Sequence, residues 1–389
     1  MSEESAREGR ITEEGLKKLR ELDGAKLRIS KMRIGNELVS KETIKRFVDG
    51  VGDVNPLWQD EEYAGKTKYK TIVAPPSWLY SVIGPGVQHG LPGVHSFHAG
   101  DDWEFYKPIL LGDRVKGEAI AKGYDEIKGS SFAKRIIKQY QDRLYYNDRG
   151  ELIAKALRWN MRTERAETRS QGRYSQVPLP HPWTEKELQK IEEEVLSEQI
   201  RGSQVRYWED VELGEELPPL VKGPVGITDE VAWTAGYAPG WLKAHGAAVR
   251  IYREHPSWGF RDPETFAMEP IAAVHWSKWA ANIAGLPQPY DLGAQRQSWV
   301  IQLLCNWMGD EGWLKRCYAE YRSFVFLSDV VWLRGKVMDK YIDESKEYCV
   351  DIETSGFNQR GENTIPGKAT VILPSKGGGA WPVAKRLSN

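Results

Sequence analysis

Apolar and polar residues alternate along two stretches of the chain, residues 129–141 and 347–354. A period of two is typical of a half-buried strand, so both stretches are predicted to be strands. Helix-start signals lie upstream of them, at Ser40-Lys41-Glu42-Thr43 and at Thr228-Asp229-Glu230, where a small polar side chain can cap the first turn. Each half of the chain is therefore predicted to hold a short strand, a helix and then several strands. This order is typical of the α+β class, with one helix followed by a long antiparallel sheet.

The chain also carries an internal repeat of domain length. Four landmarks occur in the same order in both halves: a Gly-x-Glu-Leu run, the helix-start signal, an Asp that follows a Leu-x pair, and an Asn-x-Arg-Gly-Glu turn. Apart from the helix starts, they lie at residues 35–38 and 214–217, 111–115 and 327–331, and 147–151 and 358–362. Four matches in order indicate a duplication, with each turn expected between two strands.

The repeat divides the chain into two domains, residues 1–180 and 205–389. Residues 173–182 are polar and proline-bearing, as expected of a linker, and residues 183–200 carry a Thr-x-x-Glu capping box, which predicts a linker helix within 181–204. The second copy holds an insertion of about 38 residues, roughly residues 238–268, with three prolines. Loops of this length inside a compact domain are commonly lids or binding elements, so a cap is predicted here.

Composition excludes several classes of function. Lys and Arg number 54 against 55 Asp and Glu, so no basic field is present to recruit nucleic acid. No apolar run approaches the roughly 18 residues that a membrane span needs. Three cysteines are too few and too scattered for a disulfide framework or a zinc site, so a reducing cytoplasm is predicted.

Two further features of composition could carry chemistry. The chain has 16 tryptophans, which either fill the core or line a wide apolar cavity for a bulky acyl group. His89, His95 and His98 lie close together, but their spacing fits no standard zinc pattern. They are interpreted as part of a glycine-rich connecting loop with two prolines. No metal site is predicted.

Two runs carry the candidate chemistry. The first is Gly52-Asp53-Val54-Asn55-Pro56-Leu57, followed by Asp60-Glu61-Glu62-Tyr63-Ala64. It resembles the signature of MaoC-like dehydratases and hydratases, which include the (R)-specific enoyl-CoA hydratases. The resemblance covers most of both halves, and the whole chain resembles a double hot dog acyl dehydratase with a divergent N-terminal MaoC-type domain. The second run, Glu269-Pro270-Ile271-Ala272-Ala273-Val274-His275-Trp276, stands at the corresponding place in the second half.

This resemblance implies two tandem hot dog domains, each a long helix wrapped by a curved antiparallel sheet, arranged as a pseudo-dimer. It implies hydration of an enoyl thioester or dehydration of a 3-hydroxyacyl thioester, with acyl-CoA as substrate and no metal or organic cofactor. In the family an Asp and a His five residues later act together on water, because hydration needs a base and an acid. A homodimer, or assembly with another hot dog chain, is also implied.

Both halves depart from the family's pattern. The first keeps Asp53, Asn55 and Pro56 but has Trp58 at the His position. The second has His275, but Pro270 stands at the Asp position and Glu269 is the nearest carboxylate. Three interpretations remain open. Glu269 and His275 form a complete site, or Asp53 serves His275 across the pseudo-dimer, or the Asp–His chemistry is lost and the chain binds acyl groups without reacting.

The first interpretation is the one adopted. It makes His275 the general base or acid and Glu269 the group that holds water, with the amide of Gly293 as oxyanion hole. Tyr290, Trp276 and Arg296 are predicted to contact substrate. Arg296 would pair with a coenzyme A phosphate or, equally, be a buried structural arginine. The first half, with Asp53 and Asn55 as a remnant, would bind the acyl group. The competing classes are a non-catalytic subunit and a thioesterase.

Overall fold

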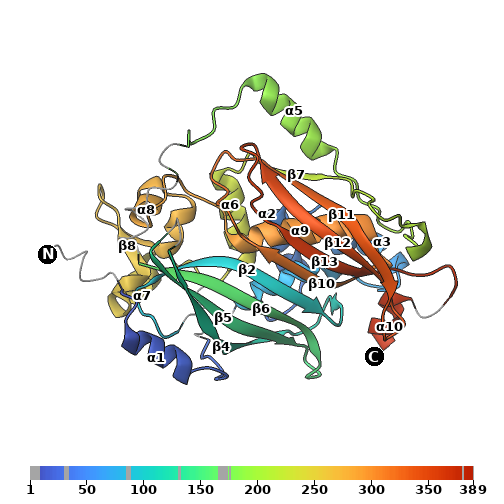
Figure 1. Ribbon diagram of the computed structural model, residues 1–389, viewed down its shortest axis with the longest axis horizontal. Helices are drawn as coiled ribbons and strands as arrows, with labels where there is room; N and C mark the ends of the chain where they lie inside the picture. The colour runs from blue at the N-terminus through green and yellow to red at the C-terminus, as the bar shows by residue number, and fades with distance from the viewer. Residues whose placement is uncertain are drawn as a thin grey trace.

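The two halves of the chain share one continuous antiparallel sheet, as the computed structural model shows for residues 9–29, 35–84, 89–129, 133–164, 174, 177–378 and 381–388 (Figure 1). Nine strands follow one another in the order β4-β5-β6-β2-β10-β13-β12-β11-β7. The first four belong to the first copy and the other five to the second. The copies meet where β2 pairs with β10, for example Cys317 with Trp103.

The strands of the large sheet have 11–13 residues in the first copy and 3–12 residues in the second. The first copy supplies β2 (His95–Phe105), β4 (Lys116–Lys128), β5 (Arg135–Tyr146) and β6 (Leu152–Thr163). The second supplies β7 (Leu220–Lys222), β10 (Trp313–Glu320), β11 (Val331–Ile342), β12 (Tyr348–Asn358) and β13 (Gly367–Ile372). Two small sheets pair β1 (Val73–Ala74) with β3 (Ile109–Leu110) and β8 (Gly259–Arg261) with β9 (Met268–Pro270).

The helices of the described residues lie along the chain before the strands of each copy, between them and at the C-terminal end. The α-helices are α1 (Glu13–Glu21), α2 (Lys41–Val51), α3 (Glu61–Lys66), α5 (Glu185–Leu196), α6 (Ile227–Tyr237), α7 (His245–Glu254), α8 (Lys278–Ile283), α9 (Gly293–Met308) and α10 (Pro382–Ser388). The 3₁₀ helices are η3 (Pro56–Trp58), η4 (Pro76–Ser81), η5 (Trp208–Asp210), η6 (Pro256–Trp258) and η7 (Ile271–His275). None of the helices in the described ranges is long and apolar enough to cross a bilayer.

The predicted duplication is visible in the two equivalent turns and in the crossing of α2 and α6. Asn147 and Asn358 each close a turn by accepting from the arginine two residues later, at 3.1 and 3.0 Å. The helices α2 and α6 approach closely at Gly50 and Gly236. A Cβ at Gly50 would lie 2.7 Å from the carbonyl oxygen of Ala232. Glycine is therefore required there by close backbone approach.

The copies differ in their central helix. In the second copy α9 is buried along its whole length against the sheet, as the hot dog fold demands. The corresponding segment of the first copy is η4, which is only six residues long. The prediction of a long helix in both domains is therefore correct for the second copy alone. Residues 85–88, which follow η4, lie outside the described part of the chain.

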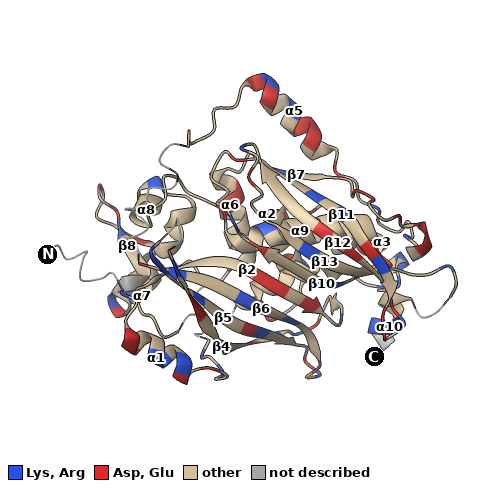
Figure 2. Ribbon diagram, viewed as in Figure 1, with Lys and Arg blue, Asp and Glu red and all other residues tan. Residues whose placement is uncertain are grey.

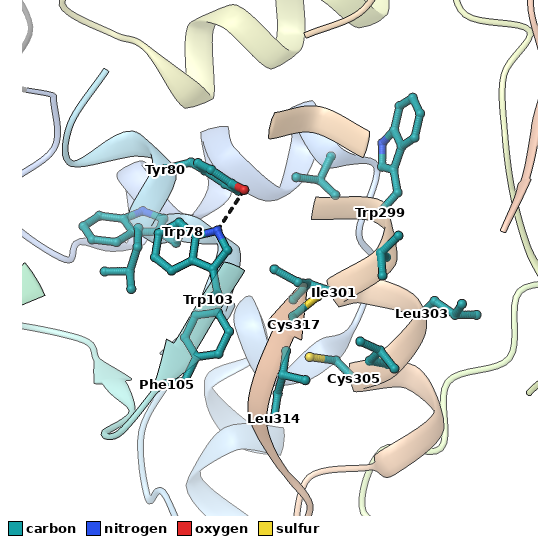
Figure 3. Close-up of a cluster of buried hydrophobic side chains, with 14 of the residues drawn as sticks. Trp78, Tyr80, Trp103, Phe105, Trp299, Ile301, Leu303, Cys305, Leu314 and Cys317 are labelled. Carbon is teal, nitrogen blue, oxygen red and sulfur yellow. Dashed lines mark hydrogen bonds between the residues drawn. The ribbon is translucent and has the colours of Figure 1, made fainter. Parts of the chain in front are cut away.

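The core joins the two copies into one body. Figure 3 shows Trp78, Tyr80 and Trp103 of the first copy gathered beside α9 of the second, with Trp103 donating from Nε1 to the Tyr80 hydroxyl at 2.9 Å. Many of the tryptophans thus serve packing. The cysteines are free and buried: Cys305, Cys317 and Cys349. Acidic and basic residues are interspersed along α1 and α5 in Figure 2.

The remaining predictions of local structure are largely confirmed. Ser40 and Thr184 form capping boxes at the starts of α2 and α5. The strand predicted at residues 129–141 begins only at Arg135, and residues 130–132 are outside the described ranges. The insertion is folded rather than a loop, since α7 and β8 lie within it and β9 begins at its last residue. The linker predicted at 173–182 is described only at residue 174 and from residue 177 onward.

Candidate active site

A cavity of about 480 Å³ lies between the two copies. Its walls come from β2 and β6 of the first copy and from η7 and the start of α9 of the second, with further residues from the insertion. His275, Tyr290 and Gly293, three of the residues predicted to form the site, line this one space. The structure therefore brings together the histidine and the helix start that thioester chemistry needs.

His275 is the last residue of η7, and its ring is held by the backbone. Nδ1 donates to the carbonyl oxygen of Tyr290 at 2.7 Å, and the Tyr290 ring packs edge-on at 4.8 Å between centroids. This hydrogen bond places the proton on Nδ1, which leaves the Nε2 lone pair available. Burial lowers the pKa of His275 to about 4. The imidazole is thus neutral near pH 7 and can accept a proton.

Gly293 is the first residue of α9. Its N-cap, Leu292, contributes no side-chain cap, so the start of a helix with unsatisfied N–H groups faces the cavity. A Cβ at Gly293 would lie 2.3 Å from the Tyr321 ring, so a larger residue would displace either the ring or the helix. Glycine allows the peptide to approach a ligand closely here.

Glu269 is placed away from this space. It pairs with Phe260 in the β8–β9 hairpin and is not among the described residues that line the cavity. Burial and then the charge of Glu269 raise the pKa of Tyr252 on α7, which places this carboxylate near α7. Trp276 is likewise outside the lining and packs half-buried against a satellite core beneath η7. The structure does not bring either residue together with the cavity.

Arg296 lines the cavity, but its Nη1 and Nε contacts are with groups of the protein itself. Nη1 donates to the carbonyl oxygens of Ser323 and Thr364 at 2.6 and 2.8 Å, and Nε lies 2.6 Å from Asp291 Oδ2. Only 3% of the residue is exposed. Of the two roles predicted for Arg296, this geometry is that of the buried structural arginine.

Asp291 is an acidic residue of the cavity that no sequence pattern singled out. It lines the cavity and directly follows the carbonyl that holds His275. Burial raises the pKa of Asp291, and the charge of Arg296 acts against that rise. Behind it Glu230 is fully buried, and burial together with the charge of Asp291 raises the pKa of Glu230 well above its usual range. Glu230 is therefore held as the neutral acid.

His98 and Asp101, both on β2 of the first copy, form a carboxylate–imidazole pair, and His98 lines the cavity. His98 Nε2 lies 2.8 Å from Asp101 Oδ2, and Asp101 also accepts from Arg158 at 3.0 Å and from Tyr80 at 2.6 Å. Burial acts to raise the pKa of Asp101, but the charges of Arg158 and His98 outweigh it and hold the pKa below its usual range. Burial and then the charge of Arg158 lower the pKa of His98 to about 4.

The sequence had placed His89, His95 and His98 in a connecting loop, and this was wrong for two of them. His95 and His98 lie on β2, and all three line the cavity. No group of residues suited to a metal occurs in the described part of the chain. The signal that could have located His98 is Asp101, three residues later in the sequence. In a regular strand this spacing places the two side chains on opposite faces, so it indicates a pair only where a bulge lies between them.

In the first copy, the corresponding site is nearly closed. Asp53 accepts from the Asn55 N–H at 3.0 Å and from Trp58 Nε1 at 3.0 Å. Burial raises the pKa of Asp53 to about 6. Asn55 and Trp58 border a cavity of only about 40 Å³. The turn thus keeps the predicted shape, with an indole in place of an imidazole and little space for a ligand.

The insertion covers the large cavity with aromatic rings. Trp241 and Trp258 lie within it and line the cavity, beside Tyr237 at the end of α6. Trp258 is stacked with His255 at 4.1 Å between centroids. The predicted cap is thus in contact with the space that it was expected to shape.

Comparison with known proteins gives the class to which this architecture belongs. A solved MaoC-like dehydratase superposes over 92% of this chain and 100% of its own, with TM-score 0.62 and 14% identity. A MaoC domain protein from Chloroflexus aurantiacus covers 91% of this chain and 96% of its own, with TM-score 0.54 and 11% identity. A Mycobacterium tuberculosis protein described as a double hot dog covers 92% and 98%, with TM-score 0.51 and 11% identity. The fold is that of a double hot dog protein.

Sequence matches are confined to part of the chain. Residues 30–156 match the family described as FAS1-like, dehydratase domain region. A UPF0336 protein of Streptomyces avermitilis is 27% identical over 24% of this chain and 66% of its own length. A Thermomonospora curvata protein named "Probable enoyl-CoA hydratase alpha subunit" is 27% identical over 33% of this chain and 46% of its own. These matches show a likeness to dehydratase-type sequences over the first copy, while the solved structures show the double hot dog fold of the whole chain.

Proposed function

We propose that this chain hydrates a trans-2-enoyl thioester, or dehydrates the 3-hydroxyacyl thioester in the reverse direction, with coenzyme A as the carrier. One observation carries the proposal. His275, with its Nδ1 proton fixed on a backbone carbonyl, lines the same cavity as Gly293 at the uncapped start of α9. An acceptor nitrogen and a helix start beside one space are the two parts that the reaction requires.

The reaction can be written on these groups. Water adds through oxygen to C3 of the enoyl group while its proton passes to Nε2 of His275. The electron pair moves to the thioester oxygen, where the N–H of Gly293 would stabilise the enolate charge. The imidazolium of His275 then returns that proton to C2, which completes the addition of one water molecule and restores the neutral ring. No redox step and no co-reactant besides water is involved.

The group that holds and activates the water needs a separate proposal. Glu269 was predicted for this role, but its position near α7 does not support it. Asp291 is better placed, because it lines the cavity next to the carbonyl that binds His275. As a carboxylate held by Arg296, Asp291 would position the attacking water beside the neutral imidazole, which takes up the proton. The variants Asp291→Asn and Glu269→Gln separate the two assignments, since only the former should abolish turnover.

The assignment of His275 is tested with a matched pair of variants. His275→Asn removes the ring from the cavity, and His245→Asn alters an exposed histidine at the start of α7 with φ of 50°, which Asn tolerates. Hydration of trans-2-hexenoyl-CoA is followed by loss of enoyl absorbance. His275→Asn should lower kcat by 10²–10⁴-fold, and His245→Asn should leave it unchanged. Equal activity in the two variants would overturn the assignment.

A second function is favoured by a specific observation. Neither copy holds the family's Asp–His pair, because Asp53 binds Trp58 and the residue five before His275 is Pro270. The chain would then be an acyl-binding subunit that depends on another hot dog chain, and one relative is named an alpha subunit. Turnover by the purified chain alone contradicts this alternative. Release of free coenzyme A thiol without hydration would instead support a thioesterase.

The setting of the protein is part of the proposal. The three cysteines are free and buried, which suits a reducing cytoplasm. We propose a homodimer as the assembly, with a hetero-oligomer as the form expected under the second function. Sedimentation of the purified chain distinguishes a self-associated dimer from a monomer that awaits a partner.

A further inference from the structure

One region of the cavity holds a buried cation with no acidic partner among the described residues. Arg162 on β6 is 2% exposed, and its side chain lines the cavity. Nη1 donates to Gln139 Oε1 at 2.7 Å, and Nη2 donates to the carbonyl oxygens of Leu91 and Val94 at 2.6 and 3.0 Å. All of these acceptors are neutral. The third nitrogen, Nε, is buried without a hydrogen-bond partner.

The other arginines of the cavity are different. Arg158 lies 3.0 Å from Asp101 and Arg296 lies 2.6 Å from Asp291. Each of these charges is therefore balanced inside the protein. Burial lowers the pKa of Arg162 to about 10, with no carboxylate acting against it. The guanidinium is still charged near pH 7, and a buried, uncompensated charge is costly unless a ligand neutralises it.

Two more unpartnered groups surround this guanidinium. Ser96 on β2 pairs directly with Arg162 on β6, so both side chains project from the same face of the sheet. Ser96 Oγ is buried without a partner. His89 accepts at Nε2 from Gln139 at 3.0 Å, which leaves its proton on Nδ1, and Nδ1 is buried without a partner. All three side chains line the cavity.

From these contacts we infer that Arg162, Ser96 and His89 bind a carboxylate carried at the far end of the acyl group, so that the substrate is the monothioester of a dicarboxylic acid. A guanidinium N–H, a hydroxyl and an imidazole N–H can each donate a hydrogen bond into this part of the cavity. Such a set fits a carboxylate and leaves its donors unpaired against a methyl terminus. This inference rests on the proposed hydration, because it assigns the far end of the same substrate.

The register of the sheet indicates how far this carboxylate site lies from the part of the cavity that holds Gly293. The Tyr321 ring contacts Gly293 on one side and packs edge-on against His98 at 4.9 Å on the other. His98 pairs with Asn160, and Ser96 with Arg162 is the next pair on that face. Two residues along a strand span about 7 Å. The carboxylate would therefore lie a few carbon atoms beyond the double bond.

The test compares two substrates of equal carbon number. trans-2-Hexenedioyl-CoA carries the terminal carboxylate, and trans-2-hexenoyl-CoA carries a methyl group in its place. The wild-type chain should prefer the former by at least 10-fold in kcat/KM. Arg162→Met should reduce that ratio to about 1, while Arg149→Met, on the exposed β5–β6 turn, should keep it. A wild-type ratio of 1 or less, or a ratio that survives Arg162→Met, overturns the inference.

Two further measurements keep the test decisive. Arg162 also donates to the backbone carbonyls of Leu91 and Val94, so the Arg162→Met variant can unfold. The variant Ser96→Asp instead supplies an internal carboxylate opposite Arg162, and it should abolish the preference in a folded protein.

Binding of the non-reacting pair adipoyl-CoA and hexanoyl-CoA to His275→Asn reports on the anion site without turnover. Tighter binding of adipoyl-CoA by at least 10-fold, lost in Ser96→Asp, supports the site even if hydration is absent. Equal binding of the pair overturns it even if hydration is present.

Discussion

Trp58 donates from its indole Nε1 to Asp53 Oδ2 at 3.0 Å, at the place where a MaoC-like site has its histidine. The indole keeps a hydrogen bond to the carboxylate but has no lone pair with which to accept a proton. The surrounding space is about 40 Å³, against about 480 Å³ beside His275. The duplication has therefore produced one open and one filled site from the same local turn.

The buried Asp53 gives the first prediction. Because burial raises its pKa from 3.8 to about 6, the folded state binds this proton more tightly than the unfolded state. Ionised Asp53 then costs stability above pH 6, and that cost disappears as the pH falls below about 4. The full cost is about 3 kcal/mol for a shift of this size, and roughly half of it should separate pH 7 from pH 5. Urea unfolding of wild type and Asp53→Asn at pH 5 and 7 measures it.

The sign of the effect is specific to a raised pKa. Relative to Asp53→Asn, the wild type should be more stable at pH 5 than at pH 7. Asp113, whose pKa burial also raises, lies in the first copy too, and Asp113→Asn shows whether the dependence belongs to Asp53. An identical pH dependence in wild type and Asp53→Asn would show that the carboxyl is not perturbed.

The neutral imidazole of His275 gives a second prediction, in the pH dependence of catalysis. Its pKa is lowered to about 4 by burial, so kcat/KM for hydration should be level from pH 8 down to about 5.5. It should then fall tenfold per unit as the ring becomes protonated below about pH 4. Rates are measured in brief assays, with circular dichroism confirming that the chain remains folded. A fall in kcat/KM that begins near pH 6.5 would mean that the His275 ring is solvated rather than buried.

The start of α9 gives a third prediction. Gly293→Ala places a methyl group 2.3 Å from the Tyr321 ring, so the ring or the helix start must move. Overpacking of this kind costs about 1–3 kcal/mol, and a shift of the amide should lower kcat by 10-fold or more while KM changes less. The measurement is steady-state hydration kinetics beside thermal unfolding.

Gly246→Ala is the matched control for that helix-start substitution. Gly246 is the second residue of α7, and a Cβ there meets nothing within 4 Å. Alanine in a helix is favoured over glycine by about 1 kcal/mol, so the control should be as stable as wild type or more so, with unchanged kcat. A loss of kcat in both variants would mean that the insertion, which contains α7, affects turnover, and that the effect is not specific to the oxyanion position at Gly293.

Much of the fold could be predicted from the sequence, because the informative signals were local. The capping boxes at Ser40 and Thr184 and the paired turns at Asn147 and Asn358 each rest on residues within five positions. Because these signals occur in the same order in both halves, they indicate the duplication. The reduction of the first copy's central helix to η4 was not predicted, since it depends on how far one helix extends over the sheet.

The candidate site was predictable only where its residues lie near one another in sequence. Ser96 and Arg162 are brought together by strand register, which no local pattern specifies. His98 and Asp101 would project to opposite faces of a regular strand. The irregular register between His98 and Gly100 reverses this alternation and places both on one side. Neither the donor set nor this pair could be derived from spacing alone.

The aromatic cap gives the last prediction. Trp258 and Trp241 both line the cavity from the insertion, and under the proposed function their rings would cover the bound acyl group. Trp258→Ala should lower kcat/KM for the preferred enoyl-CoA by about 10-fold, chiefly through KM, because removing a large ring loses about 1–3 kcal/mol of apolar burial. Stopped-flow hydration over a range of substrate concentrations separates KM from kcat.

Val249→Ala is the control for the cap, because Val249 is 49% exposed on α7 and alanine favours the helix. It should match the wild type in both constants. If Trp258→Ala lowers kcat as strongly as His275→Asn, the insertion takes part in chemistry rather than in binding. If it changes neither constant, the insertion covers the cavity without contacting the bound acyl group, and specificity must come from β2 and β6 alone.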